Sequence, residues 1–222
     1  MGCSQVFDER GEGLKFLLHP VESPVFRGKN PFMSKEDARR LFEKVREVYQ
    51  KLNDRPLRRI VVHKTTHFTS DEMSGIATAL SNVDDIELLQ IQQDTHWRAI
   101  AFDSVRNSVS GFPVKRGTAI PLDRFSFLLW TQGDMLGVAH GNRHYYQEKR
   151  GIPSPLLIRR FRGRSALEQV GGEVLRLTKM NWNNHQLYSR LPVTISFSSE
   201  LAEIAKHIDK AWPGFYDFRY FM

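Results

Sequence analysis

The chain has 222 residues, of which 41% are hydrophobic and 26% are charged. This composition is typical of a globular protein, and it excludes wholesale disorder, a collagen-like repeat and a disulfide scaffold. The 32 lysines and arginines exceed the 25 aspartates and glutamates, which gives a formal net charge of +7. A surplus of this size favours a polyanionic partner, but it specifies neither a fold nor a base sequence.

The single cysteine and the lack of a recognisable targeting signal in the sequence favour a reduced, cytoplasmic protein. Cys3 is the single cysteine, so it cannot form an internal disulfide. The sequence has no apolar run of the roughly 20 residues that a membrane helix needs, and no signal-peptide pattern at its start. Met1 and Gly2 resemble the start of a myristoylation motif, but Val6 stands where that motif requires Ser or Thr. We therefore expect no membrane partner.

The first half of the chain alternates strand and helix patterns. Ser34 and Asp37 form an N-cap with an acidic first turn, and apolar residues follow at helical spacing until Pro56. The β-branched run 59–63 is typical of a strand buried in a parallel sheet. In chain order the expected elements are a hairpin with arms near 6–7 and 14–18, a loop over 20–31, a helix over 34–52, a strand over 59–63, a helix over 70–80 and a strand over 86–91.

The second half predicts mainly strands, followed by two helices. No internal repeat, low-complexity linker or composition shift interrupts it. A strand, helix and strand in succession indicate a right-handed crossover, so we expect one α/β domain whose sheet is covered by helices. The expected elements are strands over 97–102, 118–122, 125–131 and 156–161, and helices over 166–180 and 198–208.

Most of the charge surplus falls in one segment. Between Gly141 and Arg164 there are seven basic residues and one acidic residue, which gives 7 − 1 = +6. Aromatic residues are interleaved with them, a combination that suits phosphate contact and base stacking. The alternative is a solvated loop and an exposed strand face. The basic residues are Arg143, Lys149, Arg150, Arg159, Arg160, Arg162 and Arg164.

A second polar cluster lies at 179–185, where a helix is expected to end. Its asparagines can donate hydrogen bonds to phosphate oxygens, and Lys179 adds a positive charge. An Asn-rich helix cap and turn explains the same pattern equally well. The asparagines are Asn181, Asn183 and Asn184.

No catalytic constellation stands out. Two-metal nuclease chemistry needs carboxylates that converge from strand ends, but the strand 59–62 ends in His63 and Lys64, and a lysine repels a cation. The acidic pairs, among them Asp71-Glu72, lie at helix starts or in turns, where carboxylates ordinarily serve as caps. His63 and His67 are a weak metal signal. No nucleophile elbow or phosphate-binding glycine loop is present.

A series of short segments, in order through nearly the whole chain, carries a family resemblance. The series resembles the PIWI domain of prokaryotic Argonautes. It implies an α/β fold with an RNase H-like mixed sheet flanked by helices and lacking its first strand, and it implies guide and target nucleic acid, RNA or DNA, as partners. The segments are 5–13, 60–65, 68–72, 116–118, 127–133, 177–184, 191–194 and 220–222.

The resemblance also implies a departure from cleaving members, which carry Asp, Glu, Asp and a final Asp or His around divalent metal. The first Asp would precede Met1, and the loop expected to carry the Glu has the sequence 27–30, Arg-Gly-Lys-Asn. Lys64 takes the place of the next Asp. The last position falls near Ser198 or Ser199, with Glu200 as the near candidate. We therefore expect a catalytically inactive protein with no catalytic residues.

One feature of the family can be assigned to a defined residue. The resemblance implies that the C-terminal carboxylate, here that of Met222, helps hold a divalent cation such as Mg²⁺ against the 5′-phosphate of the guide. Lys179 and Arg219 are the expected phosphate neighbours. The chain 1–222 then corresponds to a partial PIWI domain with no MID, PAZ or N domain, so a MID-containing polypeptide or an associated effector protein is a further expected partner.

Together these features predict a nucleic-acid-binding module of a guide-directed prokaryotic defence system. Two alternatives remain open: a metal-dependent guide-directed endonuclease, and an interaction subunit that completes the fold of a partner protein. The candidate nucleic-acid-binding residues are Lys179, Asn181, Asn183, Asn184, Arg159, Arg160, Arg162 and Arg219, and the candidate metal ligand is Met222.

Overall fold

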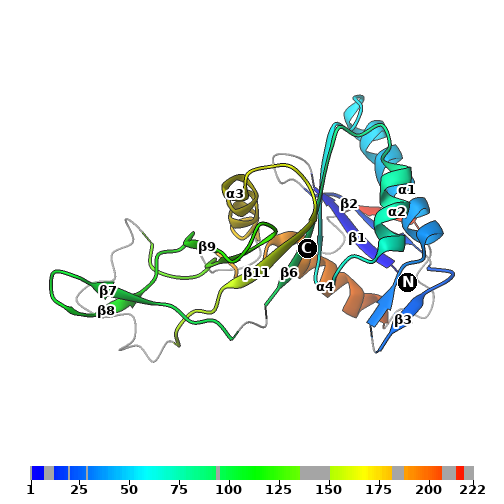
Figure 1. The fold of residues 1–222 in the computed structure, drawn as a ribbon. Helices are drawn as coiled ribbons and strands as arrows, with labels where there is room; N and C mark the ends of the chain where they lie inside the picture. The colour runs from blue at the N-terminus through cyan, green and yellow to red at the C-terminus, as the bar shows by residue number, and fades with distance from the viewer. Residues whose placement is uncertain are drawn as a thin grey trace. The chain divides into compact units, whose positions relative to one another are not determined.

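The structure is a computed structural model that describes most of the chain (Figure 1). The described part divides into two compact units. The first comprises 1–89, 161–164 and 194–222, and the second comprises 90–160 and 165–193. The described residues are 2–7, 13–19, 21–28, 30–93, 96–135, 151–181, 188–206 and 214–217.

The first unit contains most of the helical structure. Its elements are β1 (Gly2–Phe7), β2 (Gly13–His19), β3 (Val25–Arg27), β4 (Asn30–Phe32), α1 (Lys35–Asn53), β5 (Arg59–Lys64), α2 (Ser70–Ala79), the first part of β6 (Asp85–Gln92), nearly all of α4 (Val193–Lys206) and β12 (Gly214–Asp217).

The second unit is richer in strands. Its elements are β7 (Ile100–Asp103), β8 (Ser108–Pro113), β9 (Ala119–Pro121), β10 (Ser126–Leu129), most of β11 (Leu156–Arg162) and α3 (Leu167–Leu177). Trp130 is almost completely buried here, and its indole N–H donates to the carbonyl of Pro153 at 3.1 Å.

The main sheet has five strands in the order β5-β6-β11-β10-β9, in which β10 runs antiparallel to both β11 and β9. A three-stranded sheet has the order β1-β2-β12, and the β3–β4 and β7–β8 hairpins are separate two-stranded sheets. This arrangement confirms the predicted α/β fold with a mixed sheet flanked by helices. The predicted burial of the strand near 59–63 is wrong, because β5 lies at an edge of the main sheet and its residues are half-buried.

Helices α1 and α2 pack closely against each other (Figure 1). The Ser34 hydroxyl accepts a hydrogen bond from the Asp37 N–H and begins α1 as predicted. Gly75 of α2 lies so near α1 that an added Cβ would meet the Lys35 carbonyl at 2.2 Å. The core between these helices and the neighbouring strands includes Leu17, Leu41, Phe42, Phe68, Ile76, Leu80 and Leu88.

Several predicted elements differ from the structure. The loop expected over 20–31 contains strands β3 and β4, and β8 and β12 were not predicted. Helix α4 begins at Val193 rather than near 198, directly after Pro192. β3, β4 and β12 have three or four residues, too few to show the alternation on which a sequence prediction rests. β8 is longer, but its sequence, SVSGFP, includes a glycine and a proline, which are uncommon in strands.

Within the described residues, no helix combines the length and the hydrophobicity that crossing a membrane requires.

Candidate nucleic-acid interface

The carboxyl end of β5 carries a buried ion pair. The Lys64 ammonium lies 2.5 Å from Oε1 of Glu72, whose side chain is only 1% exposed. Lys64 is the last residue of β5, and Glu72 lies in the first turn of α2, so the chain reverses between them. Lys64 therefore places its charge against a carboxylate of the next helix.

Two aromatic rings complete the surroundings of the ammonium. Its nitrogen lies 4.8 Å from the ring centre of Phe32 and 5.5 Å from that of Phe68. The His67 ring packs against Phe32 at 4.6 Å. Cation–π contacts of this kind favour a charged lysine at a partly desolvated position. The Lys64 ammonium is thus stabilised both by the Glu72 carboxylate and by two ring faces.

Glu72 also organises the start of α2. One of its oxygens accepts from the Thr69 N–H at 2.9 Å, and Thr69 in turn accepts from the Glu72 N–H, which forms a capping box. Its other oxygen accepts from the Met33 N–H at 3.2 Å. The capping interpretation of the acidic pair 71–72 is confirmed for Glu72. Its contact with Lys64 could not be read from capping patterns.

The two histidines near this site have separate partners. Nδ1 of His63 lies 2.7 Å from the Thr194 hydroxyl of α4, whereas the His67 ring lies against Phe32. The Ser198 hydroxyl, one turn after Thr194, donates to the Thr194 carbonyl at 2.8 Å. A shared metal site for the two histidines does not form in this geometry.

The residues at the end of β5 do not fit a two-metal nuclease site. A divalent ion needs oxygen ligands with free lone pairs, but the Lys64 ammonium already lies against the Glu72 carboxylate. Glu200, the candidate for the last carboxylate, is exposed on α4. Within the described residues, no group of three His, Cys, Asp or Glu side chains is placed to hold a metal ion.

The predicted arginine cluster lies on β11, where strand alternation separates its members. Arg160 shares a face with the buried Leu156 and Ile158, and its guanidinium donates to the Ser165 carbonyl at 2.6 Å. Arg159 lies on the opposite face and is exposed. Arg162, the last residue of β11, falls on the face of Arg160 by alternation but is also exposed. Arg159 and Arg162 are thus accessible to a ligand, whereas the Arg160 guanidinium is already engaged in a hydrogen bond to the Ser165 carbonyl.

The carboxylate of Asp123 lies in the field of Arg159. The Ser126 hydroxyl and the Phe125 N–H donate to this carboxylate, and together with the weaker attraction of Arg159 they lower its pKa. Arg159 pairs with Ser126 in the β10–β11 register. Part of the positive field of Arg159 is therefore offset by a carboxylate on the neighbouring loop.

The polar cluster near 179 begins at the end of α3. Lys179 is exposed, and Asn181 is half-buried. The segment is fixed by Arg116, which donates to the Leu175 carbonyl at 3.0 Å and to the Thr178 hydroxyl at 2.6 Å. A cation at a helix C-terminus is favoured by the helix dipole. The sequence prediction did not include Arg116 among the site residues.

Arg116 itself is partly desolvated. Burial lowers the pKa of its guanidinium, while the phenol of Tyr188 acts in the opposite direction. The Tyr188 ring lies 4.8 Å from the guanidinium carbon. In the sequence, the only indication that Arg116 belongs to the site is its place in the segment 116–118. The fold is needed to bring it to the end of α3.

Several candidate residues lie outside the described residues and remain predictions. They are Asn183, Asn184, Arg219 and Met222, together with Arg143, Lys149 and Arg150 of the basic segment.

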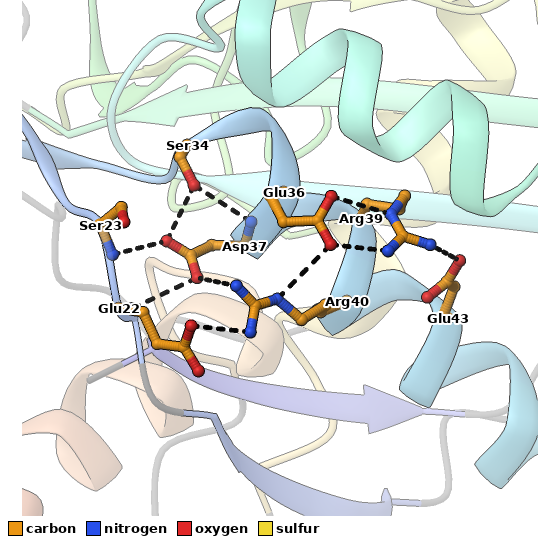
Figure 2. Close-up of polar contacts among 8 residues, drawn as sticks. All are labelled: Glu22, Ser23, Ser34, Glu36, Asp37, Arg39, Arg40 and Glu43. Carbon is orange, nitrogen blue, oxygen red and sulfur yellow. Dashed lines mark hydrogen bonds and ion pairs between the residues drawn. The ribbon is translucent and has the colours of Figure 1, made fainter.

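A polar network fixes the loop that precedes β3 (Figure 2). The buried carboxylate of Asp37 accepts from the backbone N–H groups of Glu22 and Ser23 at 3.2 and 3.0 Å, and from the Ser34 hydroxyl at 2.9 Å. Burial alone would raise the pKa of Asp37, but these hydrogen bonds outweigh it and lower the pKa. Arg40 adds an ion pair to Glu22 at 2.8 Å.

Comparison with solved structures identifies the fold. A crystal structure of Aquifex aeolicus Argonaute superposes with a TM-score of 0.68 at 20% identity and covers 99% of this chain. The chain has the Argonaute PIWI-like fold. The structure of that Argonaute with externally bound siRNA gives the same TM-score and 98% coverage. Clostridium butyricum Argonaute, bound to a guide DNA and a 19-mer target DNA, gives 0.64 at 13% identity and 93% coverage.

This PIWI-like chain spans about a quarter of the Argonaute chains that it matches, between 26% and 28% of their lengths. No protein-family model and no curated protein matches its sequence. The agreement with Argonaute therefore lies in the fold.

Proposed function

We propose that this chain binds guide and target nucleic acid as the catalytically inactive PIWI-like portion of a guide-directed prokaryotic defence system in the cytoplasm. The observation that carries this proposal is the Lys64–Glu72 pair. It lies where the resemblance implies a metal-binding carboxylate, within a fold shared with Argonautes that hold siRNA or a guide DNA and its target.

Electrostatics support binding without cleavage at this position. The Lys64 ammonium lies against a Glu72 oxygen that a divalent ion would need as a ligand, and its positive charge repels such an ion. The net charge of +7 and the exposed Arg159, Arg162 and Lys179 support contact with a polyanion. Phosphate contacts of this kind position a strand without reading its sequence.

A divalent cation at the guide 5′-phosphate remains part of the proposal. In the family that the sequence resembles, a C-terminal carboxylate holds this ion, and Lys179 and Arg219 are the proposed phosphate neighbours in this chain. When bound, such an ion neutralises the phosphate charge.

Two measurements test the function. The chain is purified from its expression host at low salt, and any co-purifying small RNA or DNA is sequenced. The chain is then incubated with a 5′-phosphorylated guide and a labelled complementary target in Mg²⁺ or Mn²⁺. We expect salt-sensitive binding of the guide–target duplex and an intact target strand.

The outcomes separate the three functions. Cleavage of the matched target that disappears in Glu200→Gln would establish a nuclease. Absence of any nucleic-acid binding at low salt would contradict the binding function and favour an interaction subunit. Binding without cleavage in either metal ion supports the proposal.

A further inference from the structure

The β3–β4 hairpin exposes an aromatic side chain and an arginine next to it in the sequence. Phe26 is 67% exposed and lies opposite the exposed Pro31 in the strand register. Arg27, the last residue of β3, is also exposed; strand alternation directs it to the other face of the hairpin from Phe26. Gly28 makes the turn with a φ of 62°. An exposed aromatic ring beside cations is the combination that stacks on bases and contacts phosphates.

The N-terminal side of this hairpin is tied to α1. The Asp37 carboxylate holds the backbone of the two residues just before the hairpin, as Figure 2 shows for Glu22 and Ser23. Asp37 is completely buried. Two charge-assisted hydrogen bonds to backbone N–H groups fix the path on which the chain enters β3.

The C-terminal side is tied to α2 and β5. Phe32, the last residue of β4, is 3% exposed and lies beneath the Lys64 ammonium. The next residue, Met33, donates its N–H to the buried Glu72 carboxylate. A second buried carboxylate therefore fixes the path on which the chain leaves β4.

These attachments give a small hairpin a defined position. Two strands of three residues are not stable alone in water, because they bury little apolar surface. Here both ends of the hairpin are held by buried carboxylates, while Phe26 at its tip stays in solvent. Holding an exposed ring in place lowers the ordering cost of binding a ligand.

We propose that the β3–β4 hairpin is a nucleic-acid contact in which Phe26 stacks on an exposed base and Arg27 contacts a neighbouring phosphate. This inference rests on the proposed function and adds a contact outside the candidate residues of β11 and α3. The competing occupant is an apolar protein surface. The exposed Arg27 and the absence of acidic residues from the sequence 24–32 favour a polyanion instead.

The test uses the whole chain and a 5′-phosphorylated guide annealed to a complementary target strand, in DNA and RNA versions. Phe26→Ala should weaken binding about tenfold, the usual scale for one lost base stack. Phe26→Trp should retain the affinity, and its fluorescence should be quenched on binding. Phe26→Leu separates stacking from apolar burial, because leucine keeps an apolar surface but has no ring.

Phe102→Ala is the matched control. Phe102 is a similarly exposed phenylalanine, at 63%, on β7, and the residue that follows it is Asp103 rather than an arginine. Its replacement should leave duplex affinity unchanged.

Each result has a defined meaning. If Phe26→Ala binds as tightly as the parent chain, the hairpin is not a contact, although the proposed function stands. If Phe26→Leu binds like the parent while Phe26→Ala does not, the position serves apolar burial rather than stacking, which overturns the inference. If the parent chain binds no duplex at all, the proposed function and the hairpin contact both fail.

Discussion

Lys64 and Glu72 bring an ammonium and a buried carboxylate together where β5 ends and α2 begins. The carboxylate meets an ammonium at 2.5 Å, a helix-cap N–H and the N–H of Met33. Its hydrogen-bonding capacity is thus taken up by the protein itself. A side chain that would otherwise attract a cation from solvent instead joins β4, β5 and α2.

Removing one partner of this pair should destabilise the fold. Lys64→Met leaves the buried Glu72 charge uncompensated, and we expect the free energy of unfolding to fall by about 2–3 kcal/mol, less than for a fully buried pair because Lys64 is 23% exposed. Urea denaturation of Lys64→Met, Glu72→Gln and the double variant gives the coupling energy. We expect the double variant to lose less than the sum of the single losses.

The Arg59–Asp85 pair is a control for this cycle. It joins a half-exposed arginine and aspartate at 2.7 Å. Because solvent screens such a pair, Arg59→Met should cost no more than about 1 kcal/mol. Equal stability of Lys64→Met and the parent chain would contradict a structural role for the buried pair.

His19 makes the stability of the fold depend on pH. Its imidazole is 5% exposed, and Nδ1 has no hydrogen-bond partner in the described part of the chain. Burial lowers its pKa below 6.5, and the nearby Lys44 and Arg40 lower it further against the opposing effect of Asp37 and Glu22. The folded state therefore disfavours the protonated ring.

The sign of the pH effect follows from this lowered pKa. The unfolded chain takes up the proton first as the pH falls through about 6.5, so the stability present above that pH is lost toward the lower folded value. Urea midpoints measured on both sides of this pH should show the loss. His19→Gln should reduce this loss, and an unchanged pH dependence in His19→Gln would contradict this role.

At the scale of elements, the packing of α1 on α2 depends on one glycine. Alanine is the better helix former by about 1 kcal/mol, yet its Cβ at position 75 would collide with the Lys35 carbonyl and the Ala38 side chain. We expect Gly75→Ala to destabilise the fold by about 1–3 kcal/mol, as overpacking does. Thermal unfolding followed by circular dichroism measures this change.

Gly172 of α3 offers the opposite case. A Cβ there would meet only the flexible end of Arg176, at 3.9 Å. Gly172→Ala should therefore raise the stability by about 0.5–1 kcal/mol through helix propensity alone. The difference between the two substitutions measures the effect of the close α1–α2 contact at Gly75. If Gly75→Ala raised the stability, the helices would not approach each other as closely as described.

The sequence predicted the longer helices and strands better than the very short ones. The cap at Ser34, the apolar spacing of α1 and the β-branched run of β5 are local signals, and the corresponding elements form. β3 and β4 were missed because three residues carry no period. The start of α4 was missed because a proline rather than a capping residue precedes Val193 and the first turn has no acidic residue.

The prediction of site residues was also limited to local signals in the sequence. The position of Lys64 at a strand end follows from the sequence pattern, but its partner Glu72 lies on another element and had an independent explanation as a helix cap. Arg116 is a similar case, because its bonds to Leu175 and Thr178 span about 60 positions of the chain, 59 and 62. Contacts between distant residues need the fold.

At the scale of the whole molecule, the charge surplus makes a measurable prediction. Each phosphate contact adds about one unit to the slope of the logarithm of affinity against the logarithm of salt concentration. Replacing Arg159 and Arg162 by alanine should reduce that slope by about two for a guide–target duplex. If the slope were unchanged, Arg159 and Arg162 of β11 would not contact the phosphates of the duplex.

Two single variants complete this experiment. Arg160→Ala should lower the unfolding midpoint in addition to any effect on binding, because Arg160 holds the Ser165 carbonyl. Arg106→Ala, at an exposed arginine between β7 and β8, should leave the salt slope as it is in the parent chain.

The three hydrogen-bonding partners of Glu72 constrain how the sequence can evolve. Changing Lys64 alone to aspartate would place two carboxylates against each other at a buried position and remove the charge that Glu72 requires. That variant should be destabilised, and Glu72 cannot change freely either, because it also caps α2 and holds Met33. Positions 33, 64, 69 and 72 are therefore coupled, so that the cost of a change at one of them depends on the residues at the others.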